Sequence, residues 1–115
     1  MIIEGTISAP GLSDRLPVAE LIVRVLDVSG VDGPSETVVE QVGPDPVLTP
    51  GQPVAFRLEL PAGLDPRRSY ILWVHADVDG SGDVTVGDRL TTVSYPVTVD
   101  RPQPPLAVEL TEVTG

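Results

Sequence analysis

Several segments of the chain alternate apolar and polar residues with the period of two that is typical of half-buried β-strands. The alternation is clearest in residues 19–29, where Leu21, Val23 and Val25 share one face, and in residues 53–60. Seven segments are predicted to be strands: 2–7, 19–29, 36–42, 53–60, 70–76, 91–99 and 105–113. No window shows the apolar periodicity of a helix, so the pattern favours an all-β protein.

Residues 70–76 are almost continuously apolar, which indicates a central strand. Pro96 falls inside a predicted strand and therefore marks a sheet edge or a bulge. Clusters of proline and glycine separate the strands, at 9–11, 30–34, 43–46, 49–51 and 61–63. Short strands at this spacing predict one domain over 1–115, an antiparallel β-sandwich of about seven strands, immunoglobulin- or transthyretin-like.

Composition narrows the classes of function. The 115 residues include no cysteine, one histidine and, among seven basic residues, no lysine. Disulfides, thiolate chemistry, sites with two imidazoles and Schiff-base chemistry are thereby excluded. The formal charge of −10 argues against a nucleic-acid partner and against anionic membrane surfaces. These features favour a non-enzymatic acidic module.

The first residues, Met1 to Thr6, contain neither the basic region nor the apolar core of a signal peptide. No segment approaches the ~20 apolar residues that a membrane-spanning helix needs. The sequence therefore predicts a cytoplasmic protein without membrane insertion; the alternative, an envelope protein from which a leader has been removed, would show the same first residues.

The segment 77–88, Asp-Val-Asp-Gly-Ser-Gly-Asp-Val-Thr-Val-Gly-Asp, matches the twelve-residue EF-hand loop. Oxygen donors stand at alternate positions, and Gly82 occupies position 6, where the loop must turn sharply. Calcium prefers six to eight hard oxygen ligands, and alternate positions of such a loop point to its centre. The predicted Ca²⁺ ligands are the side chains of Asp77, Asp79, Ser81 and Asp88, the carbonyl of Asp83, and Thr85 directly or through water.

Two features depart from the EF-hand. Asp88 stands where glutamate is usual, as in dockerin-type calcium loops, and the flanking segments read as strands instead of helices. The segment is therefore interpreted as an EF-type loop that closes a β-hairpin. The alternative is a solvated, acidic, glycine-rich turn that binds no ion, because Asp-Gly and Ser-Gly are ordinary turn residues.

His75 lies two residues before this loop, on the strand face that also carries Trp73 and Asp77. One interpretation makes His75 a catalytic base oriented by Asp77, with Ser94 or Ser81 as nucleophile. The other makes it a structural histidine that hydrogen-bonds near the loop. We favour the structural role, because the residues around these serines do not resemble a nucleophile elbow. Trp73 is expected in the core or as half-buried cover.

Four segments resemble the YbaY/YscW-type family of small bacterial envelope lipoproteins and type III secretion lipoprotein chaperones, or pilotins. They are Val23 to Ser29 followed by Asp32, Pro53 to Leu58, Leu64 to Pro66 followed by Tyr70, and Tyr95 to Val97. The resemblance implies a compact β-sandwich with no catalytic residues. The loop 77–88 is not the short turn usual in that family, so the calcium hypothesis rests on the loop residues alone.

Two functions follow as hypotheses. In the first, a non-enzymatic module binds calcium through residues 77–88, and the ion stabilises the hairpin or orders a protein-binding surface. In the alternative, a pilotin- or chaperone-like adaptor binds a protein partner, and the acidic loop carries no ligand.

Overall fold

The computed structural model describes residues 1–30, 35–44 and 46–115. These residues form eleven strands, several of them very short. They are β1 (Ile2–Ser8), β2 (Leu16–Pro17), β3 (Glu20–Asp27), β4 (Glu36–Pro44), β5 (Val47–Leu48), β6 (Val54–Glu59), β7 (Tyr70–Asp77), β8 (Arg89–Leu90), β9 (Tyr95–Val97), β10 (Leu106–Glu109) and β11 (Thr111–Glu112). The predicted turns at 30–34 and 43–46 include residues 31–34 and 45, which lie outside the described residues. Asp32 is among them.

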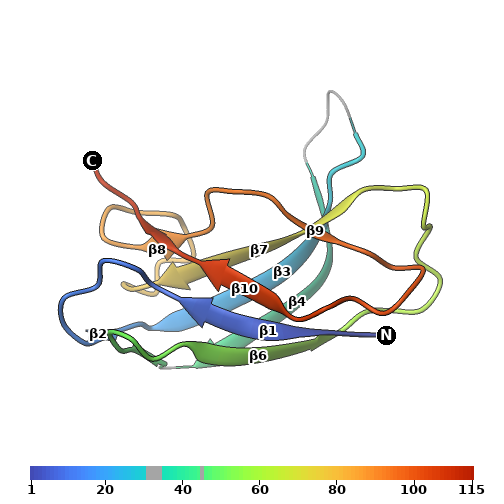
Figure 1. Cartoon of the computed structure of the whole chain (residues 1–115). Helices are drawn as coiled ribbons and strands as arrows, with labels where there is room; N and C mark the ends of the chain where they lie inside the picture. Colours follow the sequence, from blue (N-terminus) through green and yellow to red (C-terminus); the bar gives the residue numbers. More distant parts are fainter. Residues whose placement is uncertain (31–34, 45) are drawn as a thin grey trace.

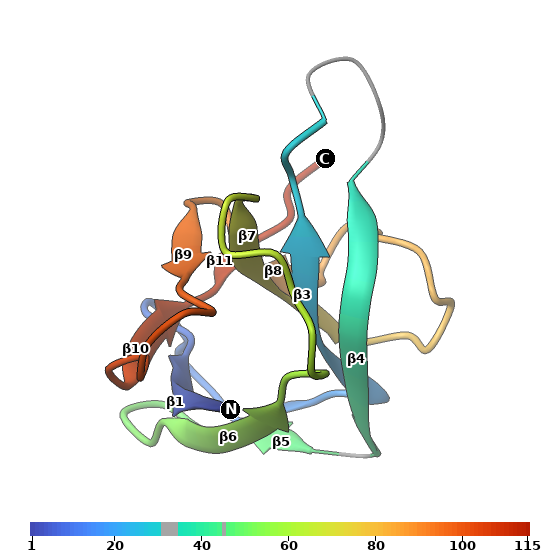
Figure 2. The same cartoon turned by 90° about the vertical axis from the view of Figure 1, so that its right-hand side faces the viewer.

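Two sheets pack face to face around a shared apolar interior (Figures 1 and 2). The smaller sheet has the order β10-β1-β6, and the larger has the order β11-β8-β7-β3-β4 with β9 also paired to β7. A two-stranded ribbon, β2-β5, stands beside them. The expected all-β sandwich is confirmed, and the described residues contain no helix long and apolar enough to cross a membrane.

Alternating side chains fill the interior as the sequence predicts. Leu21, Val23 and Val25 of β3 are buried. In β6 the burial alternates strictly, with Phe56 and Leu58 inside and the residues between them exposed. The strand β7 is central, because it pairs with β3 on one side and with β8 and β9 on the other. The period-two pattern of the sequence therefore predicted correctly which side chains of β3 and β6 are in the core.

The C-terminal half departs from the prediction in two ways. Of the predicted strand 91–99, only Tyr95–Val97 pairs in the sheet, and Val93 is 61% exposed. The predicted strand 105–113 divides at the buried Leu110 into β10, which belongs to the smaller sheet, and β11, which belongs to the larger. A strand that changes sheet in this way makes a corner of the sandwich.

The pairing of β1 with β10 is parallel, whereas the other strand pairs are antiparallel. In this register Gly5 lies opposite Leu106. A Cβ atom at Gly5 would lie 1.9 Å from the carbonyl oxygen of Leu106, so only glycine fits the close approach of the two backbones. Gly5 is therefore a structural requirement of this sheet.

The sandwich is open along one side. Within the described part of the chain, β4 pairs only with β3, and β6 pairs only with β1. Figure 2 shows these two strands next to each other, β6 at the lower edge of the smaller sheet and β4 at the right edge of the larger. Their outward-facing backbones are the exposed edges of the two sheets.

Candidate functional site

The acidic loop 77–88 connects β7 to β8, which pair as a hairpin through His75 with Leu90 and Ala76 with Arg89. The predicted hairpin is thereby confirmed. Gly82 donates its backbone N–H to Oδ2 of Asp77 at 2.8 Å, which draws the middle of the loop back to its first residue.

The polar side chains in the middle of this loop form two hydrogen bonds within the loop. Asp79 Oδ2 accepts a hydrogen bond from the Thr85 hydroxyl at 3.1 Å, and the Ser81 hydroxyl donates to the Asp83 carbonyl, also at 3.1 Å. The backbone N–H and the hydroxyl of Ser81, followed by the side chain of Asp77, lower the pKa of Asp79 to about 2. Asp79 is therefore a carboxylate at neutral pH.

Asp88 is buried beneath the loop and is the acceptor that holds its two ends together. Its Oδ2 lies 2.7 Å from Nε2 of His75 and accepts the N–H of Thr85 at 3.1 Å, while Oδ1 accepts the N–H of Val78 at 3.0 Å. Burial acts to raise the pKa of Asp88, but the hydrogen bonds from His75, Thr85 and Val78 outweigh it, and the pKa is lowered. Asp88 is thus held as a buried carboxylate.

His75 is a structural histidine in this arrangement, as favoured from the sequence. Its partner is Asp88, across the hairpin, and not Asp77. The ring of Trp73 lies 5.5 Å from that of His75, and Arg24 stacks over Trp73 at 5.0 Å. Trp73 is half-buried, so it is the predicted cover over the sheet.

The residues brought together at the base of the loop are His75, Asp77 and Asp88. All three are buried, and their potential ligand atoms lie within 4.8 Å of one another. Asp79, Ser81 and Asp83 are on the exposed part of the loop. The sequence indicated both aspartates, but the place of His75 beside Asp88 depends on the pairing of β7 with β8.

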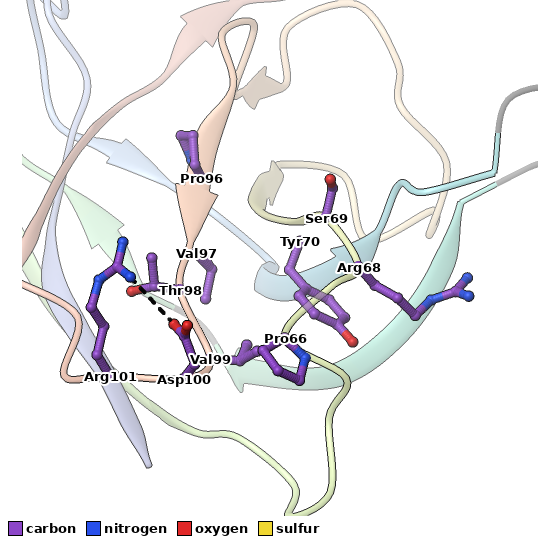
Figure 3. Close-up of a pocket in the computed structure, with 10 residues that line it drawn as sticks. All are labelled: Pro66, Arg68, Ser69, Tyr70, Pro96, Val97, Thr98, Val99, Asp100 and Arg101. Atoms are coloured by element: carbon purple, nitrogen blue, oxygen red, sulfur yellow. Dashed lines mark ion pairs between the residues drawn. The ribbon is translucent and has the colours of Figure 1, made fainter.

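A pocket of about 290 Å³ lies at the opposite end of β7, between the turn before that strand and the segment after β9 (Figure 3). Tyr70 lines it and donates its hydroxyl to the Asp65 carbonyl at 3.1 Å. Arg101, on the far side of the pocket from Arg68, pairs with Asp100 at 3.6 Å. These polar groups already bond to the chain itself, so the pocket offers no converging set of catalytic groups.

Arg68, at the rim of this pocket, donates to Asp27 at the end of β3. This hydrogen bond, followed by that from the Ser29 N–H, lowers the pKa of Asp27 below 3.8. A carboxyl group with a lowered pKa in the folded state stabilises the fold above its unfolded pKa, and loses that contribution as the pH falls through the folded value.

We therefore expect Arg68→Met to lower the free energy of unfolding at pH 7, by an amount that shrinks once the pH falls below about 3.8. Urea unfolding of the two proteins at a series of pH values from 7 to 2 measures the difference. Arg15→Met is the control, because Arg15 is exposed and forms no ion pair with any described residue. A loss for Arg68→Met that is the same at every pH would contradict the expectation.

A second hollow, which the sequence did not indicate, runs between the open edges of β4 and β6. It has a volume of about 460 Å³ and reaches the core side chains Leu21, Val23 and Phe56. Val42 of β4 lines it and is 47% exposed. A neighbouring space beside Ile2 and Glu59 shares the lining residues Gln41 and Arg57 with it. We call the two spaces together the edge groove.

Comparison with known proteins identifies the family. Residues 2–110 match the family described as type III secretion system lipoprotein chaperone (YscW). The chain belongs to this family. A solved structure described as an alternative pilotin from the type II secretion system of Vibrio cholerae has the same fold, with a TM-score of 0.74, 22% sequence identity, and coverage of 100% of this chain and 98% of that one. No curated protein matches.

The YscW assignment bears out the resemblance seen in the sequence and overturns one prediction. The expected cytoplasmic location is wrong, because the family is one of secretion-system lipoprotein chaperones, which are associated with the cell envelope. That prediction rested on the lack of a signal-peptide pattern in the first residues of the sequence. Chaperone and pilotin are descriptions of binding proteins, not of enzymes, and neither description mentions a metal.

Proposed function

We propose that this YscW-family protein is a non-enzymatic adaptor that binds a segment of a partner protein in the edge groove. The family is described as one of chaperones, whose function is to bind other proteins. The observation that carries the proposal is the open side of the sandwich, where two unpaired strand edges flank an apolar hollow. Unpaired backbone N–H and C=O groups at such an edge are a template for an added strand.

The strand β4 is the better template of the two edges. It is nine residues long, and its pairing with β3 has a bulge where Val25 and Leu26 face Val39 and Thr37. A bulge twists an edge and discourages pairing near it. The regular part of β4 that remains, from Val39 to Pro44, includes the three residues that border the groove, Gln41, Val42 and Gly43.

The side chains that line the groove indicate what kind of partner segment would bind there. Its floor is apolar, so every second residue of an added strand would place an apolar side chain against Leu21, Val23 and Phe56. Arg57 lines the groove and Glu40 of β4 pairs with Arg24, so the negative charge that remains near it is that of Glu36 and Glu59, on a chain with a net charge of −10. The expected occupant is therefore an extended segment that alternates apolar residues with polar ones and carries positive charge.

A photo-crosslinking residue at position 42 tests this proposal in cells that make the secretion apparatus. We expect it to capture one envelope protein, and a synthetic peptide of the captured segment to bind the purified protein. Val42→Arg should weaken peptide binding about tenfold or more, because it places a positive charge on the strand edge beside which the positively charged segment is expected to add. Titration calorimetry measures the affinity of both proteins.

Val93 provides the matched control, because it is an equally sized side chain, 61% exposed, that does not line the groove. The crosslinker at position 93 should capture nothing specific, and Val93→Arg should leave peptide affinity within about twofold. Equal capture at both positions, or a peptide whose affinity is insensitive to Val42→Arg, would refute the edge groove as the binding site.

A further inference from the structure

One carboxylate oxygen of the loop 77–88 is buried without a partner. Asp77 is 0% exposed, and although its Oδ2 accepts the N–H of Gly82, its Oδ1 forms no hydrogen bond with any described residue. Leaving a buried carboxyl oxygen unsatisfied is costly, and such atoms are rare in folded proteins. A bound cation would satisfy this atom.

The neighbours of Asp77 are suited to hold that cation. Ligand atoms of Asp77, Asp88 and His75 lie within 4.8 Å of one another. On the exposed part of the same loop, oxygen atoms stand in pairs 3.1 Å apart, Asp79 with Thr85 and the Ser81 hydroxyl with the Asp83 carbonyl. Oxygens separated in this way can share one ion at the roughly 2.3–2.6 Å distance that calcium prefers.

The hydrogen bond of His75 favours a hard metal ion, which prefers oxygen ligands, over a soft one. Its Nε2 is engaged with Oδ2 of Asp88 at 2.7 Å, so this nitrogen orients a carboxylate ligand instead of binding the ion. Oδ2 of Asp88 also accepts the N–H of Thr85, whereas Oδ1 accepts only the N–H of Val78 and keeps a lone pair for an ion. Asp88 can therefore supply one oxygen, and the remaining donors are oxygens as well.

We propose that the loop 77–88 binds one calcium ion, with Oδ1 of the buried Asp77 as its central ligand. The side chains of Asp79 and Ser81, the carbonyl of Asp83, Thr85 and one oxygen of Asp88 complete the coordination. The site is independent of the proposed adaptor function, because none of its residues lines the edge groove.

Calcium titration in the absence of any partner tests the site. Trp73, the single tryptophan, contacts His75 and through it Asp88, so its fluorescence should report binding. In buffer freed of metal with EDTA, a hundredfold excess of calcium over its Kd should raise the Tm by about 5 °C or more. The fluorescence change should saturate at one ion per chain, and magnesium should be much less effective.

Asp79→Ala and Asp83→Ala form a matched pair, because both remove one carboxylate from an exposed position of the loop. Asp79 binds through its side chain and Asp83 through its carbonyl, so Asp79→Ala should weaken calcium binding at least tenfold and Asp83→Ala about threefold at most. Asp77→Asn should abolish binding. If Asp77→Asn does not fold, the difference in calcium affinity between Asp79→Ala and Asp83→Ala tests the site.

Three outcomes would overturn the proposal. The first is no saturable response to calcium at millimolar concentration. The second is an equal response in the Asp79→Ala and Asp83→Ala proteins, which indicates screening of the acidic surface. The third is zinc binding that His75→Gln abolishes while calcium has no effect, which would assign the buried cluster to a different metal.

Discussion

Gly5→Ala should destabilise the protein by about 3 kcal/mol or more, because the parallel contact between β1 and β10 has no room for a methyl group. The added Cβ would meet Leu106 at 1.9 Å from its oxygen, 2.7 Å from its nitrogen and 2.8 Å from its carbonyl carbon. These are backbone atoms of a paired strand, so no side chain can rotate away. Urea unfolding should show the loss as a midpoint lower by about 1 M or more.

Gly43→Ala is the control for Gly5→Ala, because it also lies in a paired strand. A Cβ at Gly43 would lie 3.9 Å from the nearest atom, the Leu21 carbonyl oxygen, which is an ordinary contact. Replacing it should be neutral or stabilising, by up to about 1 kcal/mol. Equal stability of the Gly5→Ala and Gly43→Ala proteins would contradict the close parallel pairing.

Asp88→Ala should cost a similar amount, about 3 kcal/mol or more, even in EDTA where no divalent cation contributes. The carboxylate accepts hydrogen bonds from His75, Val78 and Thr85, and its own exposure is 1%. Removing it leaves buried donors on both ends of the hairpin without an acceptor. Thermal unfolding in EDTA measures the effect, with the exposed Asp83→Ala as a control expected within about 0.5 kcal/mol of the parent.

A double-mutant cycle separates the contact between His75 and Asp88 from general damage. Because the two side chains share one buried hydrogen bond, His75→Ala should cost little more once Asp88 is already alanine. Additive losses would show that the two residues act independently, and would contradict the 2.7 Å contact.

The strand faces could be predicted because their signal is local. In β6 burial alternates with the parity of the residue, and in β3 the alternate residues Leu21, Val23 and Val25 are the ones that join the core. The loop was predictable for the same reason, since Asp77 and Gly82 are close in sequence and their hydrogen bond closes a short turn. A pattern of residues that are near in sequence therefore identified the sandwich class and the acidic loop.

The partner of His75 could not be predicted in this way. Alternation on β7 pointed to Asp77, two residues away, whereas the hydrogen bond goes to Asp88, thirteen residues away. Only the register of β7 with β8 brings Asp88 under the strand. The same pairing encloses Asp77 and leaves its Oδ1 without a partner, which no spacing in the sequence reveals.

Residue order alone thus specified which side chains are apolar on each strand and where the chain turns. The tertiary structure decided which strands meet: the parallel entry of β10 beside β1 at Gly5, the change of sheet at Leu110, and the unpaired edges of β4 and β6. Strand pairing joins segments that are distant in sequence, and its free energy depends on backbone contacts and burial that exist only when the sheets assemble. The edge groove is a product of that assembly.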